Sequence, residues 1–301
     1  MYDVVIVGAG PAGMTAAIYA LRNNKRVALV EKNVPGGVIV NTAFVENYPG
    51  FTKIEGPSLA YAMFEQTTKL GADYIGATVT GIEIGESFFT VKTDGESLRG
   101  KTVILASGTA QKKLGAPGEE KYTGRGVSWC AICDGSLYKG EDVAVVGGGN
   151  SAFEETIYLS NLANKVYLIH RREGFRAESS LVDRVRQLKN VKMVLNARIV
   201  EFFGAETLQG VVIENTLDGK TDRLAVKACF EYIGTLPSTD YAKDLGILAD
   251  NGYILVDKNC ETAIKGIFAC GDVVDKDIRQ IATAISDGAV AALNAIKYCS
   301  G

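Results

Sequence analysis

The sequence predicts an α/β protein of two Rossmann-like dinucleotide-binding domains, with the second domain inserted into the first. Two observations lead to this prediction. A glycine-rich segment stands between an apolar strand and a helix twice in the chain, and the interval from Gly8 to Glu31 equals that from Gly147 to His170. Strand and helix patterns also resume after residue 240, as they would if the first domain were completed there.

The first domain is predicted to open with a strand at Tyr2–Val7 and a helix through about Asn23. A second strand follows at Arg26–Val30 and ends at Glu31. Alternating apolar residues and the turn signal Asp94-Gly95 predict the other strands of this domain, at residues 78–84, 88–93 and 102–106.

The inserted domain repeats this order, with a strand at Asp142–Val146, a helix through about Leu162 and a strand at Lys165–Ile169. Its remaining strands are expected at residues 191–200, 211–215 and 228–232. Asp218-Gly219 supplies a turn signal between two of them.

The C-terminal segment returns to the first domain with a strand at Gly266–Ala269 and a helix at about Arg279–Tyr298. The first domain is therefore predicted to comprise residues 1–115 and 240–301, and the inserted domain residues 116–239. The chain is expected to cross near Pro117 and Pro237, where proline interrupts the periodicity. Helical spacing places five apolar residues of the last helix along one stripe: Ile281, Ile285, Ala289, Leu293 and Ile296.

The composition excludes several classes of protein. Of the 301 residues, 47% are hydrophobic and 22% are charged, and the net charge of -3 predicts no binding to nucleic acid or anionic membranes. Glycines interrupt the apolar run Val4–Leu21, and Asp3 precedes it, so this run predicts a buried strand and helix instead of an export signal. We expect a cytoplasmic protein, in which close cysteines are catalytic candidates.

The first glycine-rich segment is a candidate site for an adenosine diphosphate group. A pyrophosphate can approach the backbone at such a turn and bind the N–H groups of the helix N-terminus. Glu31 ends the next strand, where a carboxylate accepts hydrogen bonds from ribose hydroxyls. The residues of this turn are Gly8, Gly10, Pro11, Ala12 and Gly13.

The second segment, with Gly149, Asn150 and Ser151, differs where the next strand ends. His170, Arg171 and Arg172 occupy that position, and Arg176 follows. Guanidinium groups bind a 2′-phosphate through charge-assisted hydrogen bonds, so the pattern favours NADPH over NADH. The alternative is a solvated basic stretch that leads into the next helix.

A third segment, Gly271-Asp272-Val273, precedes the last helix. Asp272 is expected to face a hydroxylated chain or a phosphate, and the helix after Arg279-Gln280 offers its N–H groups to a ligand. A flavin dinucleotide is long enough to reach both this segment and the first glycine turn. The alternative is an ordinary loop carboxylate.

Cys130 and Cys133 form the only close cysteine pair. With one histidine in the chain and no second pair, a zinc site is disfavoured, whereas one thiol of such a pair can attack a disulfide and the other can resolve it. Asp134 is either a proton donor to the leaving thiol or a helix cap, and both interpretations stay open. Because the pair and the NADPH site lie in one domain, we hypothesise that this domain rotates about the two crossings to bring each in turn to the flavin. The other cysteines are expected to be core residues (Cys229, Cys270) or inert (Cys260, Cys299).

Over essentially its full length, the chain resembles the low-molecular-weight thioredoxin reductases. The larger disulfide reductases differ, because they carry their cysteines near the first glycine loop and use a C-terminal histidine base. The matching segments are residues 8–13, Val45-Glu46-Asn47-Tyr48-Pro49-Gly50, Cys130-Ala131-Ile132-Cys133-Asp134-Gly135, Gly147-Gly148-Gly149-Asn150-Ser151-Ala152, His170-Arg171-Arg172, Phe175-Arg176-Ala177, Gly271-Asp272-Val273 and Arg279-Gln280.

The resemblance implies FAD, NADPH, a homodimer, and reduction of thioredoxin through Cys130 and Cys133 with Asp134 as general acid. It also implies the domain rotation. Val38 replaces the family's glutamine and Ile132 the usual threonine, so a flavin contact and the redox potential or docking surface are expected to differ. The residues implied for FAD outside the first glycine turn are Gly37, Val38, Asn47, Gly108, Asp272, Arg279, Gln280 and Ile281.

Three alternative functions remain at this stage. The same machinery could take electrons from NADH or ferredoxin, or serve another protein acceptor. A redox-sensing nucleotide-binding module would belong to a different class, and the intact cysteine pair argues against it. A flavin reductase of the ferredoxin–NADP type would lack the pair.

Overall fold

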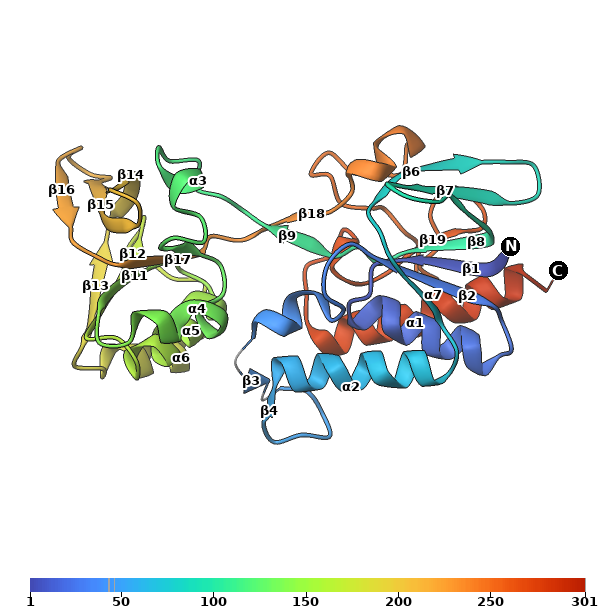
Figure 1. The fold of residues 1–301 in the computed structure, drawn as a ribbon, viewed down its shortest axis with the longest axis horizontal. Helices are drawn as coiled ribbons and strands as arrows, with labels where there is room; N and C mark the ends of the chain where they lie inside the picture. The colour runs from blue at the N-terminus through green and yellow to red at the C-terminus, as the bar shows by residue number, and fades with distance from the viewer. Residues whose placement is uncertain (43, 46, 301) are drawn as a thin grey trace. The chain divides into compact units, whose positions relative to one another are not determined.

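The computed structural model describes the chain apart from residues 43, 46 and 301, and apart from the side chains of Asn41, Phe44, Ile132 and Cys133. The chain divides into two compact units, one of residues 1–110 with 236–301 and one of residues 111–235 (Figure 1). The crossings lie a few residues before the expected positions because strands β9 (Thr109–Gln111) and β18 (Thr235–Pro237) pair there as a two-stranded sheet. Pro117 therefore follows the first crossing and belongs to the second unit.

The first unit is built on a seven-stranded sheet. Strands β5, β2, β1, β8 and β19 run parallel, and β7 and β6 extend the sheet as an antiparallel ribbon. Parallel strands buried on both faces are rich in valine, isoleucine and leucine, as β1 and β2 are. The strands are β1 (Tyr2–Val7), β2 (Val27–Glu31), β5 (Asp73–Gly76), β6 (Val79–Ile84), β7 (Phe89–Thr93), β8 (Leu98–Leu105) and β19 (Ile267–Ala269).

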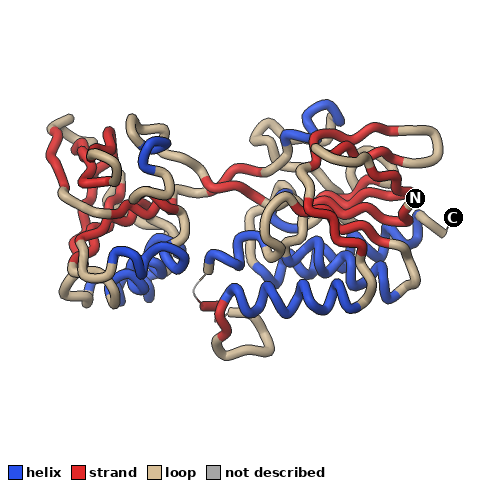
Figure 2. The backbone as a smooth tube through the Cα atoms, in the orientation of Figure 1, coloured by secondary structure: helices blue, strands red, loops and turns tan. Residues whose placement is uncertain are grey.

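In this unit, three helices pack on one face of the sheet and enclose an apolar core (Figure 2). They are α1 (Pro11–Arg22), α2 (Gly56–Lys69) and α7 (Ile281–Tyr298). The opposite face is covered by the β6–β7 ribbon and by residues 241–256. Shorter elements are η1 (Gly37–Asn41), β3 (Phe44–Val45), β4 (Ile54–Glu55), η3 (Asp240–Leu245) and η4 (Gly271–Val273).

The predicted helix forms as α7, but the apolar stripe is not the face that the core buries. Leu293 is exposed, and Ile281, Ile285, Ala289 and Ile296 are only partly buried. The two helices α1 and α7 pack too closely for large side chains, since a Cβ at Gly288 would overlap with the carbonyl oxygen of Ala12. The buried face instead consists of small residues: Ala284, Gly288, Ala291, Ala292 and Ala295.

The second unit contains a five-stranded parallel sheet in the order β10-β17-β11-β12-β13 and a three-stranded antiparallel sheet β14-β15-β16. The expected strand at 191–200 is divided, because Asn196 takes a left-handed conformation with φ of 51°. Strands of the parallel sheet are β10 (Val127–Ser128), β11 (Asp142–Gly147), β12 (Lys165–His170), β13 (Val191–Leu195) and β17 (Ala228–Tyr232). The other sheet consists of β14 (Ala197–Gly204), β15 (Leu208–Asn215) and β16 (Thr221–Leu224).

Both faces of the parallel sheet in this unit are covered. Helices α4, α5 and α6 pack on one face, and the antiparallel sheet with α3 packs on the other. Among the described residues, no helix combines the length and apolar character needed to cross a membrane. The helical elements are α3 (Glu119–Tyr122), α4 (Ala131–Asp134), η2 (Gly135–Tyr138), α5 (Asn150–Ser160) and α6 (Ser179–Arg186).

Candidate nucleotide sites and redox centre

The first glycine turn joins β1 to α1 and leaves an open position at the start of the helix. Gly8 has φ of 104°, and a Cβ there would overlap with the carbonyl of Ala106. A Cβ at Gly13 would overlap with the carbonyl of Gly8. Gly10, the N-cap of α1, has no neighbour within 4 Å of an added Cβ and provides no side-chain cap. The uncapped end of the helix therefore faces space that an anion can occupy.

The second glycine turn has the same construction between β11 and α5. A Cβ at Gly147 would lie 2.5 Å from the carbonyl oxygen of Tyr232, and one at Gly148 would overlap with the His170 ring. Gly149 is the N-cap of α5, again without a side-chain cap and without neighbours within 4 Å. Both units thus present an open, uncapped helix N-terminus at the end of a central parallel strand.

The residues that end the neighbouring strands differ in charge, as expected. Glu31 ends β2, where its two carboxylate oxygens accept the N–H groups of Ala9 and Asn33, each at 2.9 Å. The Ala9 contact fixes the carboxylate beside the first glycine turn. His170 ends β12, with Nε2 at 3.1 Å from the carbonyl oxygen of Gly174.

The pKa of His170 is lowered, which favours the neutral imidazole. Burial lowers the pKa of the imidazole, and the charges of Arg171, Arg172 and Arg176 lower it further. Its ring packs against Phe175 with the centroids 5.3 Å apart. The positive charge at this site therefore comes from the three guanidinium groups.

The loop after β12 folds back onto the second glycine turn. The N–H groups of Arg176 and Ala177 donate to the carbonyl of Gly148 at 2.8 and 3.1 Å. Asn150, at the start of α5, exchanges hydrogen bonds with Glu178 at 3.0 and 2.9 Å. Arg171, Arg172 and Arg176 are exposed and form no ion pair with the described carboxylates. Ser151, next to Asn150, is also exposed.

The third segment brings together residues distant in sequence. Asn47 donates to the side-chain oxygen of Gln280 at 3.1 Å, immediately before Ile281 begins α7. Arg279 donates to the carbonyl of Asp272 at 3.2 Å, and its guanidinium lies 4.1 Å from the centre of the Tyr253 ring. Arg279 therefore stabilises η4 through a hydrogen bond to its backbone.

Asp272 gives the clearest indication of a ligand site. Its Oδ1 atom is buried and has no hydrogen-bond partner in the described structure, and burial raises the pKa of the carboxyl. A buried acceptor without a partner is costly, and a ligand hydroxyl would satisfy it. The residues of this segment thus fit the hydroxylated chain of a flavin dinucleotide.

The remaining residues implied for the flavin lie on loops of the first unit. Gly37 begins η1, and a Cβ there would lie 3.4 Å from the Cα of Gly10, so η1 starts beside the first glycine turn. Val38 follows with 44% of its surface exposed. Gly108 lies just after β8, with no neighbour within 4 Å of an added Cβ.

Cys130 is disulfide-bonded and only 8% exposed. The side chain of Cys133 lies outside the described part of the chain. The Cys130 N–H donates to the Ser128 hydroxyl at 3.0 Å, and the Cys130 carbonyl accepts the Asp134 N–H at 3.1 Å. Asp134 stands at the N-cap of η2 but makes no side-chain capping bond there, which removes the support for a capping role.

The other cysteines are free thiols. Burial raises the pKa of each, and to about 12 for Cys260, so the reactive thiolate is disfavoured in all of them. Cys229 lies in β17, as expected, whereas Cys270 follows the end of β19. The four free cysteines are Cys229, Cys260, Cys270 and Cys299.

Two residues that lie near Cys130 in the structure were not predicted from the sequence. Tyr232 accepts the N–H of Ala131, the residue after Cys130, at 3.0 Å. Glu231 precedes it and is fully buried in β17. The sequence feature that could have indicated Glu231 is a charged residue within an apolar strand, because a buried carboxylate requires a partner or a proton.

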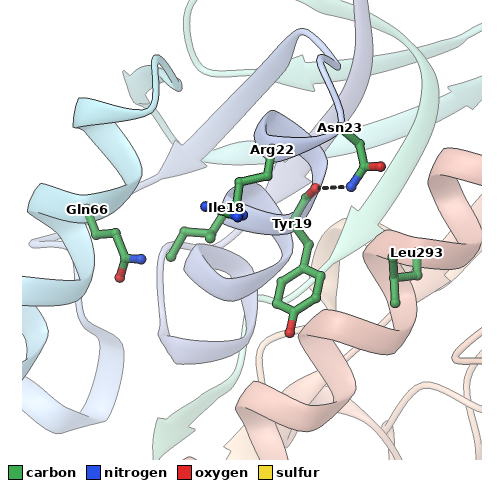
Figure 3. Close-up of a pocket in the computed structure, with 6 residues that line it drawn as sticks. All are labelled: Ile18, Tyr19, Arg22, Asn23, Gln66 and Leu293. Atoms are coloured by element: carbon green, nitrogen blue, oxygen red, sulfur yellow. Dashed lines mark hydrogen bonds between the residues drawn. The ribbon is translucent and has the colours of Figure 1, made fainter.

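A surface hollow in the first unit, shown in Figure 3, has none of the candidate site residues in its lining. It lies along the second half of α1, whereas the glycine turn precedes that helix. Asn23 donates to the carbonyl of Tyr19 at its edge at 2.9 Å. The hollow is lined by Ile18, Tyr19, Arg22, Asn23, Gln66 and Leu293.

Two uncapped glycine turns of Rossmann type, together with a disulfide-bonded cysteine in the inserted unit, define a dinucleotide-dependent disulfide oxidoreductase. The chain belongs to the pyridine nucleotide-disulphide oxidoreductase family, whose model matches residues 2–288.

Similar proteins support the same classification along the whole chain. The chain is 45% identical over 299 residues to the thioredoxin reductase of Ureaplasma parvum, covering 99% of this chain and 97% of that one. It is 42% identical to the Bacillus subtilis thioredoxin reductase, with 99% and 95% covered. The crystal structure of Lactococcus lactis thioredoxin reductase matches with a TM-score of 0.96 and 41% identity, covering 100% of this chain and 99% of the other.

Proposed function

We propose that this chain is an NADPH-dependent thioredoxin-disulfide reductase that works through FAD and its own Cys130–Cys133 pair. The observation that carries the proposal is the disulfide-bonded state of Cys130 in the unit that also has the second glycine turn. Relatives at 42–45% identity are named thioredoxin reductases. FAD, when bound, supplies a carrier that takes two electrons from a nicotinamide and gives them to a disulfide.

The first unit would hold FAD. The open helix end at Gly10 would bind the pyrophosphate, and Glu31 would bind the adenosine ribose. Asp272 would accept a hydroxyl of the ribityl chain, which would satisfy its buried oxygen. The proposed FAD residues are Gly8, Gly10, Pro11, Ala12, Gly13, Glu31, Gly37, Val38, Asn47, Gly108, Asp272, Arg279, Gln280 and Ile281.

The second unit would hold NADPH. Its pyrophosphate would lie at the helix end formed by Gly149, Asn150 and Ser151. The exposed guanidinium groups of Arg171, Arg172 and Arg176 form no ion pair among the described residues and would bind the 2′-phosphate. His170 would support the site as a neutral ring.

The chemistry of the chain's own residues balances in two steps. Two electrons and one proton convert the Cys130–Cys133 disulfide to one thiolate and one thiol. A thiolate then attacks the thioredoxin disulfide, and the second cysteine resolves the mixed disulfide, which releases dithiol thioredoxin. Asp134 would donate the proton that the leaving thiolate requires.

Three further properties belong to the proposal. The chain would act in the cytoplasm as a homodimer, and thioredoxin or a thioredoxin-like protein would be its acceptor. The second unit would rotate about residues 110–111 and 235–236 to present NADPH and the cysteine pair alternately. The chain passes between the units through β9 and β18, two short paired strands at which the backbone could turn.

The test is NADPH-driven reduction of a panel of protein disulfides by wild type and by Cys130→Ser. We expect wild type to reduce thioredoxin and the variant to reduce no disulfide, although NADPH still bleaches its flavin. Parallel bleaching with NADH and with reduced ferredoxin identifies the donor. Purified protein without a yellow cofactor, or a variant as active as wild type, would contradict the proposal.

A further inference from the structure

The end of β17 lies next to the segment that enters the redox centre. β10 and β17 run parallel, with Val127 opposite Cys229 and Ser128 opposite Phe230. Continuing this register by one residue places Trp129 beside Glu231. Successive strand residues face opposite sides of a sheet, so Glu231 faces the same side as Cys229 and Tyr232 faces the side of Ala131.

Glu231 is one of two carboxyl groups buried together on this side. Glu231 is fully buried and Glu119, from α3, is 3% exposed. The Glu119 carboxylate accepts the N–H groups of Leu114 and Gly115. Neither oxygen of Glu231 has a partner at hydrogen-bonding geometry.

The indole N–H of Trp129 is a buried donor that could pair with an unpartnered oxygen of Glu231. Its Nε1 atom is buried and has no hydrogen-bond partner among the described residues. Glu231 lies next to this indole and next to the Glu119 carboxyl. A buried donor and a buried acceptor that lie side by side need only a small shift to pair.

Glu231 holds a proton at neutral pH. Burial, and then the charge of Glu119, raise its pKa to about 8. Among the described residues on this side of the sheet, Cys229 lies on β17 itself, Tyr122 of α3 belongs to the same core cluster as Cys229, and the Lys113 ammonium lies 6.0 Å from the centre of the Trp129 ring. The Tyr122 hydroxyl already donates to the carbonyl of Gly204.

We propose that Glu231 is a positioning residue: as a neutral acid it bridges the Glu119 carboxylate and the Trp129 indole, and so fixes the backbone that leads into Cys130. The protonated oxygen donates to Glu119, and the other oxygen accepts the indole N–H. Loss of the proton places two carboxylates against each other in a buried site, and their repulsion displaces Trp129. The reactivity of Cys130 then depends on a proton that neither cysteine carries.

The first experiment uses the fact that Trp129 is the only tryptophan in the chain. Tryptophan emission of the holoprotein is measured between pH 6 and pH 9.5 in wild type, Glu231→Gln, Glu119→Gln and Glu155→Gln. We expect a transition near pH 8 in wild type, none in Glu231→Gln, and a transition at lower pH in Glu119→Gln, which lacks the repelling charge. Glu155→Gln is the matched control, because Glu155 is also buried with a pKa of about 8 but packs in α5 on the opposite face of the sheet.

The second experiment measures the consequence for Cys130. Dithiothreitol-reduced protein is alkylated with iodoacetamide, and modification of the Cys130 peptide is followed by mass spectrometry. Glutamine mimics the protonated acid at every pH, so wild type and Glu231→Gln should react at equal rates at pH 6.5. At pH 9 we expect their rates to differ several-fold, because only wild type has gained the second charge.

The inference rests on the proposed function only for its role in turnover, since neither readout needs NADPH or thioredoxin. A wild-type emission transition that persists in Glu231→Gln would overturn it, as would a rate ratio that is the same at both pH values. If both readouts behave as expected while no protein disulfide is reduced, the proposed function fails and the positioning role of Glu231 stands.

Discussion

The hydroxyl of Tyr232 accepts the backbone N–H of Ala131 at 3.0 Å, so the last residue of β17 holds the residue that follows Cys130. Glu231, one position earlier, lies next to Trp129, which precedes Cys130. Successive residues of one strand therefore contact both neighbours of Cys130 from opposite faces of the sheet. β17 therefore holds the backbone on both sides of Cys130.

Replacing Tyr232 with phenylalanine tests the first of these contacts. The variant leaves the N–H of Ala131, a fully buried residue, without its acceptor, which costs about 1–3 kcal/mol of unfolding free energy. Thermal unfolding of the holoprotein should show a lower Tm than wild type. Tyr138→Phe is the control, because the described structure gives its hydroxyl no hydrogen bond, and an equal loss in both variants would refute the assignment.

The two glycine turns should respond differently to the same substitution. Gly10→Ala and Gly149→Ala add a methyl group that meets no protein atom within 4 Å, so both variants should fold. The methyl group would occupy the space proposed for a pyrophosphate. We expect Gly10→Ala to be purified without flavin, and Gly149→Ala to keep its flavin but bind NADPH at least tenfold more weakly in a fluorescence titration. Full flavin content in the first variant would contradict the placement of FAD.

The arginine cluster should set the preference for NADPH. Removing one charge-assisted contact to the 2′-phosphate costs about 1.5–3 kcal/mol, or roughly tenfold to a hundredfold in affinity. Arg171→Ala, Arg172→Ala and Arg176→Ala should each raise the KM for NADPH and leave the KM for NADH unchanged. Arg198→Ala, an exposed arginine of the same unit that pairs with Glu214, is the control. An equal rise in the KM for NADPH and for NADH would show that the arginine cluster does not bind the 2′-phosphate.

The buried Glu155 should make stability depend on pH. Burial raises the pKa of this carboxyl from 4.5 to about 8, so the folded chain keeps a proton that the unfolded chain releases. The free energy of unfolding therefore falls as pH rises from about 4.5 to about 8. Glu155→Gln should be more stable than wild type at pH 8 by on the order of a few kcal/mol, and equally stable near pH 4.

Denaturant unfolding at several pH values measures this difference. The exposed Glu201→Gln serves as the control and should follow wild type throughout. A Glu155→Gln curve parallel to that of wild type across the whole pH range would show that Glu155 is ionised in the folded chain.

Features that depend only on residues close together in the chain could be predicted from the sequence. The strands at residues 2–7, 142–147 and 228–232, and the glycine turns after the first two, follow from local patterns, because a strand, a tight turn and a helix start are each specified within a few residues. The two-unit organisation followed from the same patterns occurring twice. The cysteine pair was recognisable because the chemistry of vicinal thiols depends on short spacing.

The tertiary structure determines which side chains meet across long intervals of sequence. It packs α7 on α1 through Gly288 and the alanines of α7, and not through the apolar stripe. The distance between two helices depends on the side chains of both, so the sequence of one helix does not predict it. The tertiary structure also places Glu231 against Glu119 and Trp129, and these contacts join segments more than a hundred residues apart. Burial and neighbouring charge determine whether a carboxyl keeps its proton, and both arise only when the chain has folded.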